Sequence, residues 1–352
     1  MRIAVARESR DTETRVALVP ARVGELLALG HRVLVQPGAG AQAGHTDQEY
    51  RDAGAVLDEQ ALSVADLVLA VQPPEPAAIR TMPAGGVLIC LAVGQDPDVH
   101  AALRDAGVTT HAMEQVPRLS RAQSMDALTS QALVAGYRGA IVAAGLLRRI
   151  AGVHMTAAGT VPAANVLVLG AGVAGLEAIA TMHRLGARVR AYDVRASTAE
   201  EVRSLGADFV DLGLPPLDGA AGYAREMTEE RAARQQRLLT PYVAEADVLI
   251  TTAMVAGRAA PVLVSAAMVE LMRPGSVVVD LAADAGGNVE GTVAGSIVRI
   301  GNAQVWGGRN VPAQLPGPAS DLYARNVVDL AVLLLRNPDD EILVATRVAG
   351  VP

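Results

Sequence analysis

Three glycines follow a short apolar run in the middle of the chain, where the sequence reads VLVLGAGVAGLEAIA. Gly170, Gly172 and Gly175 have the spacing GxGxxG, with strand-type residues before them and a helical pattern after them. In such a turn the first glycine permits the tight bend, the second lets the backbone approach a pyrophosphate, and the third lets the helix lie close to the strand. The pattern predicts a dinucleotide-binding turn, and the alternative is a tight strand-to-helix connection without a ligand.

An acidic residue, Asp193, ends the next predicted strand, about 20 residues after the glycines, where a carboxylate accepts hydrogen bonds from an adenosine ribose. This position favours NAD(H) over NADP(H), because a 2′-phosphate would meet a negative charge. Arg195, two residues later, is also predicted to bind the cofactor, and it weakens the preference for NAD(H), since arginine can accommodate a phosphate. Ser197 and Glu200 have the spacing of a capping box and predict the start of the following helix.

A polar stretch at residues 117–131, PRLSRAQSMDALTSQ, stands out in a chain that is 51% hydrophobic. A nicotinamide carboxamide has one acceptor and one NH2 donor, so Arg118 and Asp126 could hold its plane. The neutral amide of Gln123 could bridge to a ribose or to a second nucleotide. The alternative interpretation is a polar loop that solvates a domain junction.

Composition excludes several kinds of chemistry. All 30 basic residues are arginine, so no lysine is present to bind phosphate, form a Schiff base or act as a base. The single Cys90 and six scattered histidines predict neither a disulfide framework nor a metal site. A net charge of −7 and 2% aromatic residues argue against nucleic-acid binding. No signal peptide or membrane span is predicted, so we expect a cytoplasmic chain.

The elements that must position these residues alternate between strands and helices, which predicts an α/β fold with largely parallel sheets. At 352 residues the chain suits two domains. We expect two doubly wound, Rossmann-like domains separated by a cleft, with a helix over residues 129–150 leading from one to the other. The apolar segment 320–335 is expected to return to the first domain, which gives boundaries at 1–128 plus 312–352 and at 129–311.

Three motifs resemble those of the alanine dehydrogenase and transhydrogenase group: RESRDTETRVALVP near the N-terminus, VVVDLAADAGGN at residues 277–288, and NVP at 310–312. Alanine dehydrogenases carry a lysine and a histidine that handle the amino acid and its proton. Gln72 stands at the lysine position of this chain and Ala92 at the histidine position. Oxidation of an amine needs a general acid or base, whereas direct hydride transfer between two nicotinamide rings needs only close, oriented rings.

The polar stretch itself is similar to the signature loop of domain I, the NAD(H)-binding component of proton-translocating transhydrogenase. In that family an arginine, a glutamine and an aspartate hold the nicotinamide end of NAD(H), and Arg118, Gln123 and Asp126 match them. Thr129 stands where the family usually has serine, so the hydroxyl is retained. The resemblance also implies a mobile loop that closes over the nucleotide through Tyr223.

The resemblance implies a wider set of cofactor-binding residues and several partners. The residues of this set lie in the loop, at the glycine turn and after later strands: Ser124, Met125, Val173, Val194, Gly222, Gln235 and Met254. It implies that NADP(H) sits on a partner subunit, that membrane subunits translocate protons, that the chain is a homodimer, and that it lies at the inner face of the plasma membrane through its partners. Two alternatives stay open: an amino-acid dehydrogenase that uses Arg15 and Asp284, and a catalytically silent NAD-sensing module.

Overall fold

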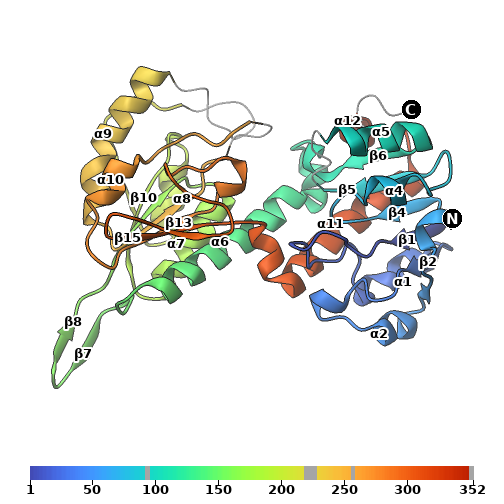
Figure 1. Cartoon of the computed structure of the whole chain (residues 1–352), viewed down its shortest axis with the longest axis horizontal. Helices are drawn as coiled ribbons and strands as arrows, with labels where there is room; N and C mark the ends of the chain where they lie inside the picture. Colours follow the sequence, from blue (N-terminus) through green and yellow to red (C-terminus); the bar gives the residue numbers. More distant parts are fainter. Residues whose placement is uncertain (92–95, 218–227, 255–257, 349–352) are drawn as a thin grey trace. The chain divides into compact units, whose positions relative to one another are not determined.

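The computed structural model describes residues 1–91, 96–217, 228–254 and 258–348. The chain forms two compact units, Met1–Gln131 together with Pro312–Pro352, and Ala132–Val311 (Figure 1). Helix α6 (Ala127–Leu146) carries the chain from the first unit into the second. The prediction of an α/β fold with two Rossmann-like domains is confirmed.

The first unit is built on a six-stranded sheet with the order β3-β2-β1-β4-β5-β6, in which every neighbouring pair is parallel. Its strands are β1 (Arg2–Val5), β2 (Arg32–Val35), β3 (Val56–Leu57), β4 (Leu67–Leu69), β5 (Val87–Cys90) and β6 (Thr109–Ala112). The order reverses between β1 and β4, and such a switch point opens a crevice at the carboxyl ends of the strands.

Helices cover both faces of this sheet because successive strand residues point to opposite sides. Ile3 and Val5 pack with α1 (Pro20–Ala28) and α11 (Pro316–Arg336), whereas Ala4 packs with the helices of the other face. The remaining helices of this unit are α2 (Asp47–Asp52), α3 (Ala61–Val64), α4 (Pro76–Ile79), α5 (Pro97–Ala106) and α12 (Glu341–Thr346), with 3-10 turns at Ala41–Ala43, Met113–Gln115 and Ser120–Met125. The C-terminal segment thus belongs to the core of the first unit.

The second unit has a seven-stranded sheet with the order β11-β10-β9-β12-β13-β15-β14, parallel except for the pairing of β14 with β15. Its strands are β9 (Asn165–Leu169), β10 (Arg188–Tyr192), β11 (Asp208–Phe209), β12 (Val248–Thr251), β13 (Val277–Asp280), β14 (Ile297–Ile300) and β15 (Ala303–Gly307). The switch point lies between β9 and β12, and the glycine turn directly follows β9.

Two apolar layers sandwich this second sheet. Val166 and Val168 face α6 and α7 (Val173–Arg184), while Leu167 and Leu169 face α9 (Glu229–Glu245) and α10 (Ala266–Glu270). Helix α8 (Thr198–Ser204) joins the first of these layers, and a 3-10 turn lies at Ala283–Ala285. Another 3-10 turn, Val311–Gln314, spans the boundary with the first unit. The alternation of valine and leucine along β9 therefore encodes burial on both faces.

A hairpin of β7 (His154–Thr156) and β8 (Gly159–Val161) extends from the second unit and was not predicted (Figure 1). Within the described ranges, none of the helices combines the length and apolar character that a membrane span requires. The same ranges contain no cluster of three or more His, Cys, Asp or Glu residues that could hold a metal ion.

Two local predictions need correction. The helix expected at 129–150 ends at Leu146, so Arg148 and Arg149 lie beyond its last turn. The capping box at Ser197 is absent, because that residue has helical backbone angles and its side chain makes no cap hydrogen bond. A complete capping box forms instead at α2, between Thr46 and Glu49.

Candidate nucleotide-binding site

The glycine turn joins β9 to α7 at the switch point of the second sheet. Gly170 has a φ of +102°, a backbone conformation that other residues rarely adopt. A Cβ atom on Gly175 would overlap the carbonyl oxygen of Gly170, so only glycine lets α7 begin this close to the strand. The fold itself therefore requires glycine at both positions.

Gly172 differs from its two neighbours in the motif. Its φ is −77°, and a Cβ atom built on it would meet no atom of the described residues within 4 Å. Neither backbone conformation nor packing within the described residues demands glycine here. The residue immediately precedes α7, whose N-terminal end favours negative charge. A bare backbone at this place is suited to the close approach of a phosphate.

Asp193 follows β10 beside this turn. Its Oδ2 accepts a hydrogen bond of 2.8 Å from the backbone N–H of Ala171, which ties the carboxylate to the glycine turn. Arg195 donates to the same carboxylate from Nε at 2.9 Å and from Nη2 at 2.8 Å. The backbone N–H of Arg195 donates to Oδ1 at 2.9 Å. The structure thus brings Asp193, Arg195 and the turn together.

A buried polar network shapes the loops beyond β12 and β13. Asn288 donates from Nδ2 to the carbonyl oxygens of Ala253 and Pro261, both at 2.8 Å, and accepts from the N–H of Ala253 at 2.9 Å. Asp280 accepts hydrogen bonds from the N–H of Asn288 and from the hydroxyl of Thr251. Burial raises the pKa of the Asp280 carboxyl above its ordinary value. Asp280 and Asn288 of the VVVDLAADAGGN motif therefore have a structural role, since their side-chain hydrogen bonds hold these loops.

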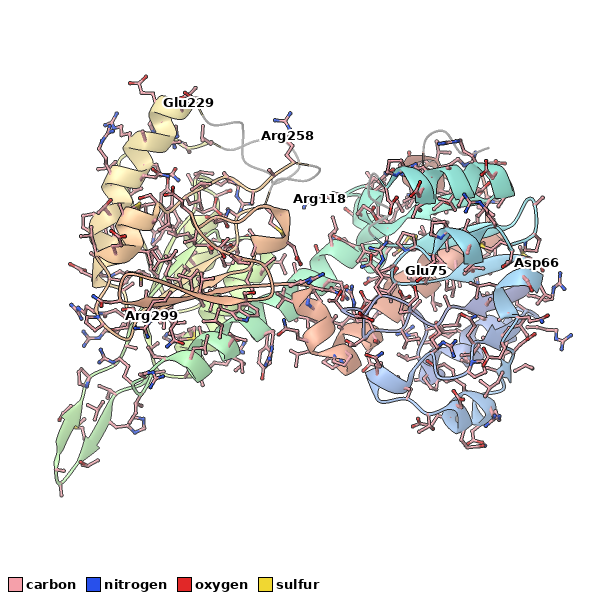
Figure 2. All side chains as sticks on the ribbon, viewed as in Figure 1. Asp66, Glu75, Arg118, Glu229, Arg258 and Arg299 are labelled. Carbon is pink, nitrogen blue, oxygen red and sulfur yellow. The ribbon has the colours of Figure 1, made fainter. Side chains whose placement is uncertain are left out.

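In the first unit, the polar stretch 117–131 forms a 3-10 helix over Ser120–Met125 that leads directly into α6. Ala122 and Met125 lie three residues apart and are buried in the core of this unit. This spacing turns Gln123 and Ser124 outward. Arg118, labelled in Figure 2, is also exposed. The polar side chains of Arg118, Gln123 and Ser124 thus lie on the solvent-exposed side of this stretch.

Asp126 and Thr129 form the start of α6. The N–H of Thr129 donates to Oδ1 of Asp126 at 2.9 Å, and its hydroxyl donates to Oδ2 at 2.7 Å. Asp126 therefore occupies the position of a helix N-cap. The threonine keeps the hydroxyl contact that a serine at this position could also make.

The C-terminal segment anchors the polar stretch at two points. Arg121 donates to both carboxylate oxygens of Asp340, at 2.8 and 3.0 Å, and to Glu341 at 2.8 Å. The guanidinium of Arg121 lowers the pKa of Asp340 by hydrogen bonding. Asn326 of α11 donates to the carbonyl oxygen of Ser124 at 2.7 Å and accepts from the hydroxyl of Ser130 at 2.7 Å. Sequence reasoning missed Asp340 and Asn326, since nothing in their local sequence links them to residues about 200 positions away.

The residues that an amino-acid dehydrogenase would use are engaged with other groups. Arg15 makes a buried bidentate ion pair with Glu13, at 2.7 Å to each oxygen, and donates to Gln131 at 2.8 Å. Gln72 donates to Glu13 at 3.3 Å. Asp284 accepts from the backbone N–H of Asn310 at 2.6 Å. Ala92 lies outside the described residues.

The other predicted cofactor residues have varied surroundings. Val173 and Met254 are exposed, and Val194 is half-buried. Gln235 is buried and accepts a 2.9 Å hydrogen bond from the hydroxyl of Tyr192. Gly222 and Tyr223, with the predicted mobile loop, lie outside the described residues.

Comparison with known proteins agrees with this fold. Residues 4–135 match the family model described as "Alanine dehydrogenase/PNT, N-terminal domain", and residues 139–348 match "Alanine dehydrogenase/PNT, C-terminal domain". The crystal structure of transhydrogenase from Sinorhizobium meliloti superposes with a TM-score of 0.89 at 42% identity and covers 99% of this chain and 98% of that chain.

Sequence relatives come from both branches of the group. An NAD(P) transhydrogenase subunit alpha chain of Rhodospirillum rubrum is 45% identical over 341 residues, which cover 94% of this chain and 89% of that protein. Alanine dehydrogenase of Bacillus subtilis is 34% identical over 297 residues, which cover 82% of this chain and 72% of that protein. The resemblance to transhydrogenase subunit alpha is confirmed, and the chain belongs to the alanine dehydrogenase/PNT family.

Proposed function

We propose that this chain is the NAD(H)-binding subunit of a proton-translocating transhydrogenase. The observation that carries NAD(H) binding is Gly172, which is glycine at a place where neither its backbone conformation nor the packing of the described residues requires glycine. The close approach of a dinucleotide pyrophosphate to this bare backbone, at the N-terminal end of α7, would explain why position 172 is glycine. Asp193 is proposed to bind the adenosine ribose, and its hydrogen bond to the N–H of Ala171 in the same turn supports this role.

The nicotinamide supplies the hydride, so the chain's own residues only bind and orient it. Arg118, Gln123 and Asp126 are proposed to hold the nicotinamide end, with Ser124, Met125 and Thr129 beside them. The anchors of this loop support the role. The side chain of Arg121 in the loop binds Asp340 of the C-terminal segment, and Asn326 of that segment holds the backbone carbonyl of Ser124. Met125 of the loop is buried in the core. A loop held in this way loses little further freedom when the ring binds.

Amino-acid oxidation is the less supported alternative. Its substrate carboxylate needs an arginine, yet the guanidinium of Arg15 is buried and already holds both oxygens of Glu13. A proton carrier is needed as well, and Gln72 has no titratable group. Hydride transfer between two nicotinamides requires neither.

This chain is proposed to act together with partner subunits. NADP(H) is held by a separate component, and membrane subunits carry the protons, which would place this chain at the inner face of the membrane.

The chain is also proposed to be a homodimer. The β7–β8 hairpin supports self-association, because among the described residues its strands pair only with each other and the exposed fraction of Met155 is 81%. Val173, Val194, Gly222, Tyr223, Gln235 and Met254 remain proposed nucleotide contacts.

The test is the absorbance change when an NAD+ analogue is reduced by NADPH, with this chain alone and then with an NADP(H)-binding transhydrogenase component. Activity only in the mixture is the expected result. NADH binding without transfer in the mixture would point to a silent NAD-sensing module. Consumption of NADH with pyruvate and ammonium would replace the proposal with an amino-acid dehydrogenase.

A further inference from the structure

The carboxylate of Asp193 is fully occupied in this chain. A carboxylate has about four acceptor positions, and four N–H groups hold these at 2.8–2.9 Å. Two donors are the backbone N–H groups of Ala171 and Arg195, which belong to the turn and to the chain after β10. The other two come from the guanidinium of Arg195, and the side chains of this pair are 18% and 7% exposed for arginine and aspartate.

A ribose diol would bind Asp193 in the same way as this guanidinium does, through two hydrogen-bond donors. The vicinal 2′- and 3′-hydroxyls offer two donors to one carboxylate, as do Nε and Nη2 of Arg195. The two backbone donors cannot leave without breaking the turn. The guanidinium can leave by rotation of its own side chain. The only acceptor positions that a ribose can gain are therefore those that Arg195 now holds.

We propose that Arg195 is a specificity-determining residue that competes with the adenosine ribose of NAD(H) for Asp193 and must turn away when the nucleotide binds. This inference rests on the proposed function, because it concerns the same nucleotide site. Arg195 also neutralises Asp193, so it reduces the repulsion that the carboxylate exerts on a ribose 2′-phosphate. The pair thus weakens NADH binding and softens the rejection of NADPH.

The test is direct binding of NADH and NADPH to the full chain and to its Arg195→Met variant, by titration of nucleotide fluorescence. Methionine keeps much of the side-chain length and removes the charge and the donors. The dissociation constant for NADH is expected to fall roughly three- to tenfold, and that for NADPH to rise by about tenfold or more. An Arg195→Lys variant, which restores the charge without the planar fork, should bind NADPH nearly as the unmodified chain does.

The matched control is Arg190→Met. Arg190 lies on β10, the strand that ends just before Asp193, and it also pairs with a carboxylate, that of Glu245 at 3.0 Å, on the exposed surface. Neither nucleotide affinity should change in this variant. Circular dichroism would establish that each variant is folded, and if Arg195→Met were not, the Arg195→Lys variant would still test competition, since its NADH affinity should exceed that of the unmodified chain.

The outcomes separate the two proposals. Weaker NADH binding by Arg195→Met would mean that the arginine holds the nucleotide directly, and unchanged affinities would mean that it does not compete. Either result overturns the inference and leaves NAD(H) binding intact. Absence of NADH binding by the unmodified chain would overturn the proposed function, and the inference with it.

Discussion

Thr129 donates two hydrogen bonds to Asp126, one from its hydroxyl to Oδ2 at 2.7 Å and one from its backbone N–H to Oδ1 at 2.9 Å. The first turn of α6 thereby orients a carboxylate that is also a proposed nicotinamide ligand. The side chain of Asp126 both caps the helix and is proposed to orient the ligand, so a change in the cap should alter the rate of hydride transfer.

Thr129→Val should lower hydride transfer several-fold and lower the free energy of unfolding by about 0.5–1 kcal/mol, because the hydroxyl contact to Asp126 is lost. Thr129→Ser keeps this donor and is the control, with transfer near that of the unmodified chain. Stopped-flow transfer and urea unfolding measure the two effects. Equal transfer by the valine and serine variants would separate the cap from the reaction.

Gln123→Asn should leave NADH binding nearly normal and slow hydride transfer by about tenfold or more. The shorter side chain keeps the amide but withdraws it from the exposed side of the loop, so ring orientation suffers more than affinity. Equilibrium NADH titration and single-turnover transfer are compared. Gln115→Asn makes the same change at an exposed residue ahead of the loop and should alter neither quantity. An unchanged transfer rate in Gln123→Asn would remove the residue from its proposed role.

Arg121→Gln should reduce transfer without much change in thermal stability. The exposed bonds to Asp340 and Glu341 contribute little to folding, yet they tie the loop to α12. The reduction should be mimicked in the unmodified chain by high salt, which screens an exposed ion pair. Arg22→Gln breaks another surface pair, with Glu25, and serves as the control. A transfer rate equal to that of this control would show that the loop holds its shape without Arg121.

Glu8 should make stability depend on pH. Burial raises its pKa to about 8 from 4.5, although the N–H groups of Val71 and Gln72 donate to its carboxylate. The folded chain keeps a proton that the unfolded chain releases between these two values. The contribution of Glu8 to the free energy of unfolding should therefore be fully present below pH 4.5 and fall as pH rises toward 8, by up to about 1.4 kcal/mol per pH unit.

Glu8→Gln tests this expectation, because glutamine carries no proton that pH can remove. The variant should lose less stability than the unmodified chain between about pH 6 and pH 8.5, measured by urea unfolding. The difference between the two curves isolates Glu8 from other titrating groups. Parallel curves would mean that Glu8 ionises in the folded chain as it does in water.

Met155→Glu should convert the proposed dimer to monomer, because it places a charge on the exposed β7–β8 hairpin. Sedimentation equilibrium at several concentrations measures the change. Leu271→Glu alters another exposed apolar residue, at the end of α10, and should leave the oligomeric state as it was. A dimer that survives Met155→Glu would place the interface elsewhere.

Local sequence patterns were enough to predict the fold class of this chain, its glycine turn and its family. The alternation of strands and helices predicted the fold class, because each face of a buried parallel strand needs its own apolar residues. GxGxxG predicted the turn before α7, since a positive φ and a close helix approach are local needs of Gly170 and Gly175. Three short motifs led to the correct family, and the polar stretch, found by its composition, pointed to the transhydrogenase relatives within it.

Only the tertiary structure decided how the side chains of those patterns are engaged. The bidentate hold of Arg195 on Asp193 depends on a rotamer that spacing does not predict, and the anchoring of Ser124 by Asn326 joins residues 202 positions apart. The failed capping box at Ser197 has the same origin, because backbone angles set by the preceding turn decide whether a hydroxyl can reach the helix. Sequence motifs determined which groups are present, and packing around the two sheets decided which of them meet.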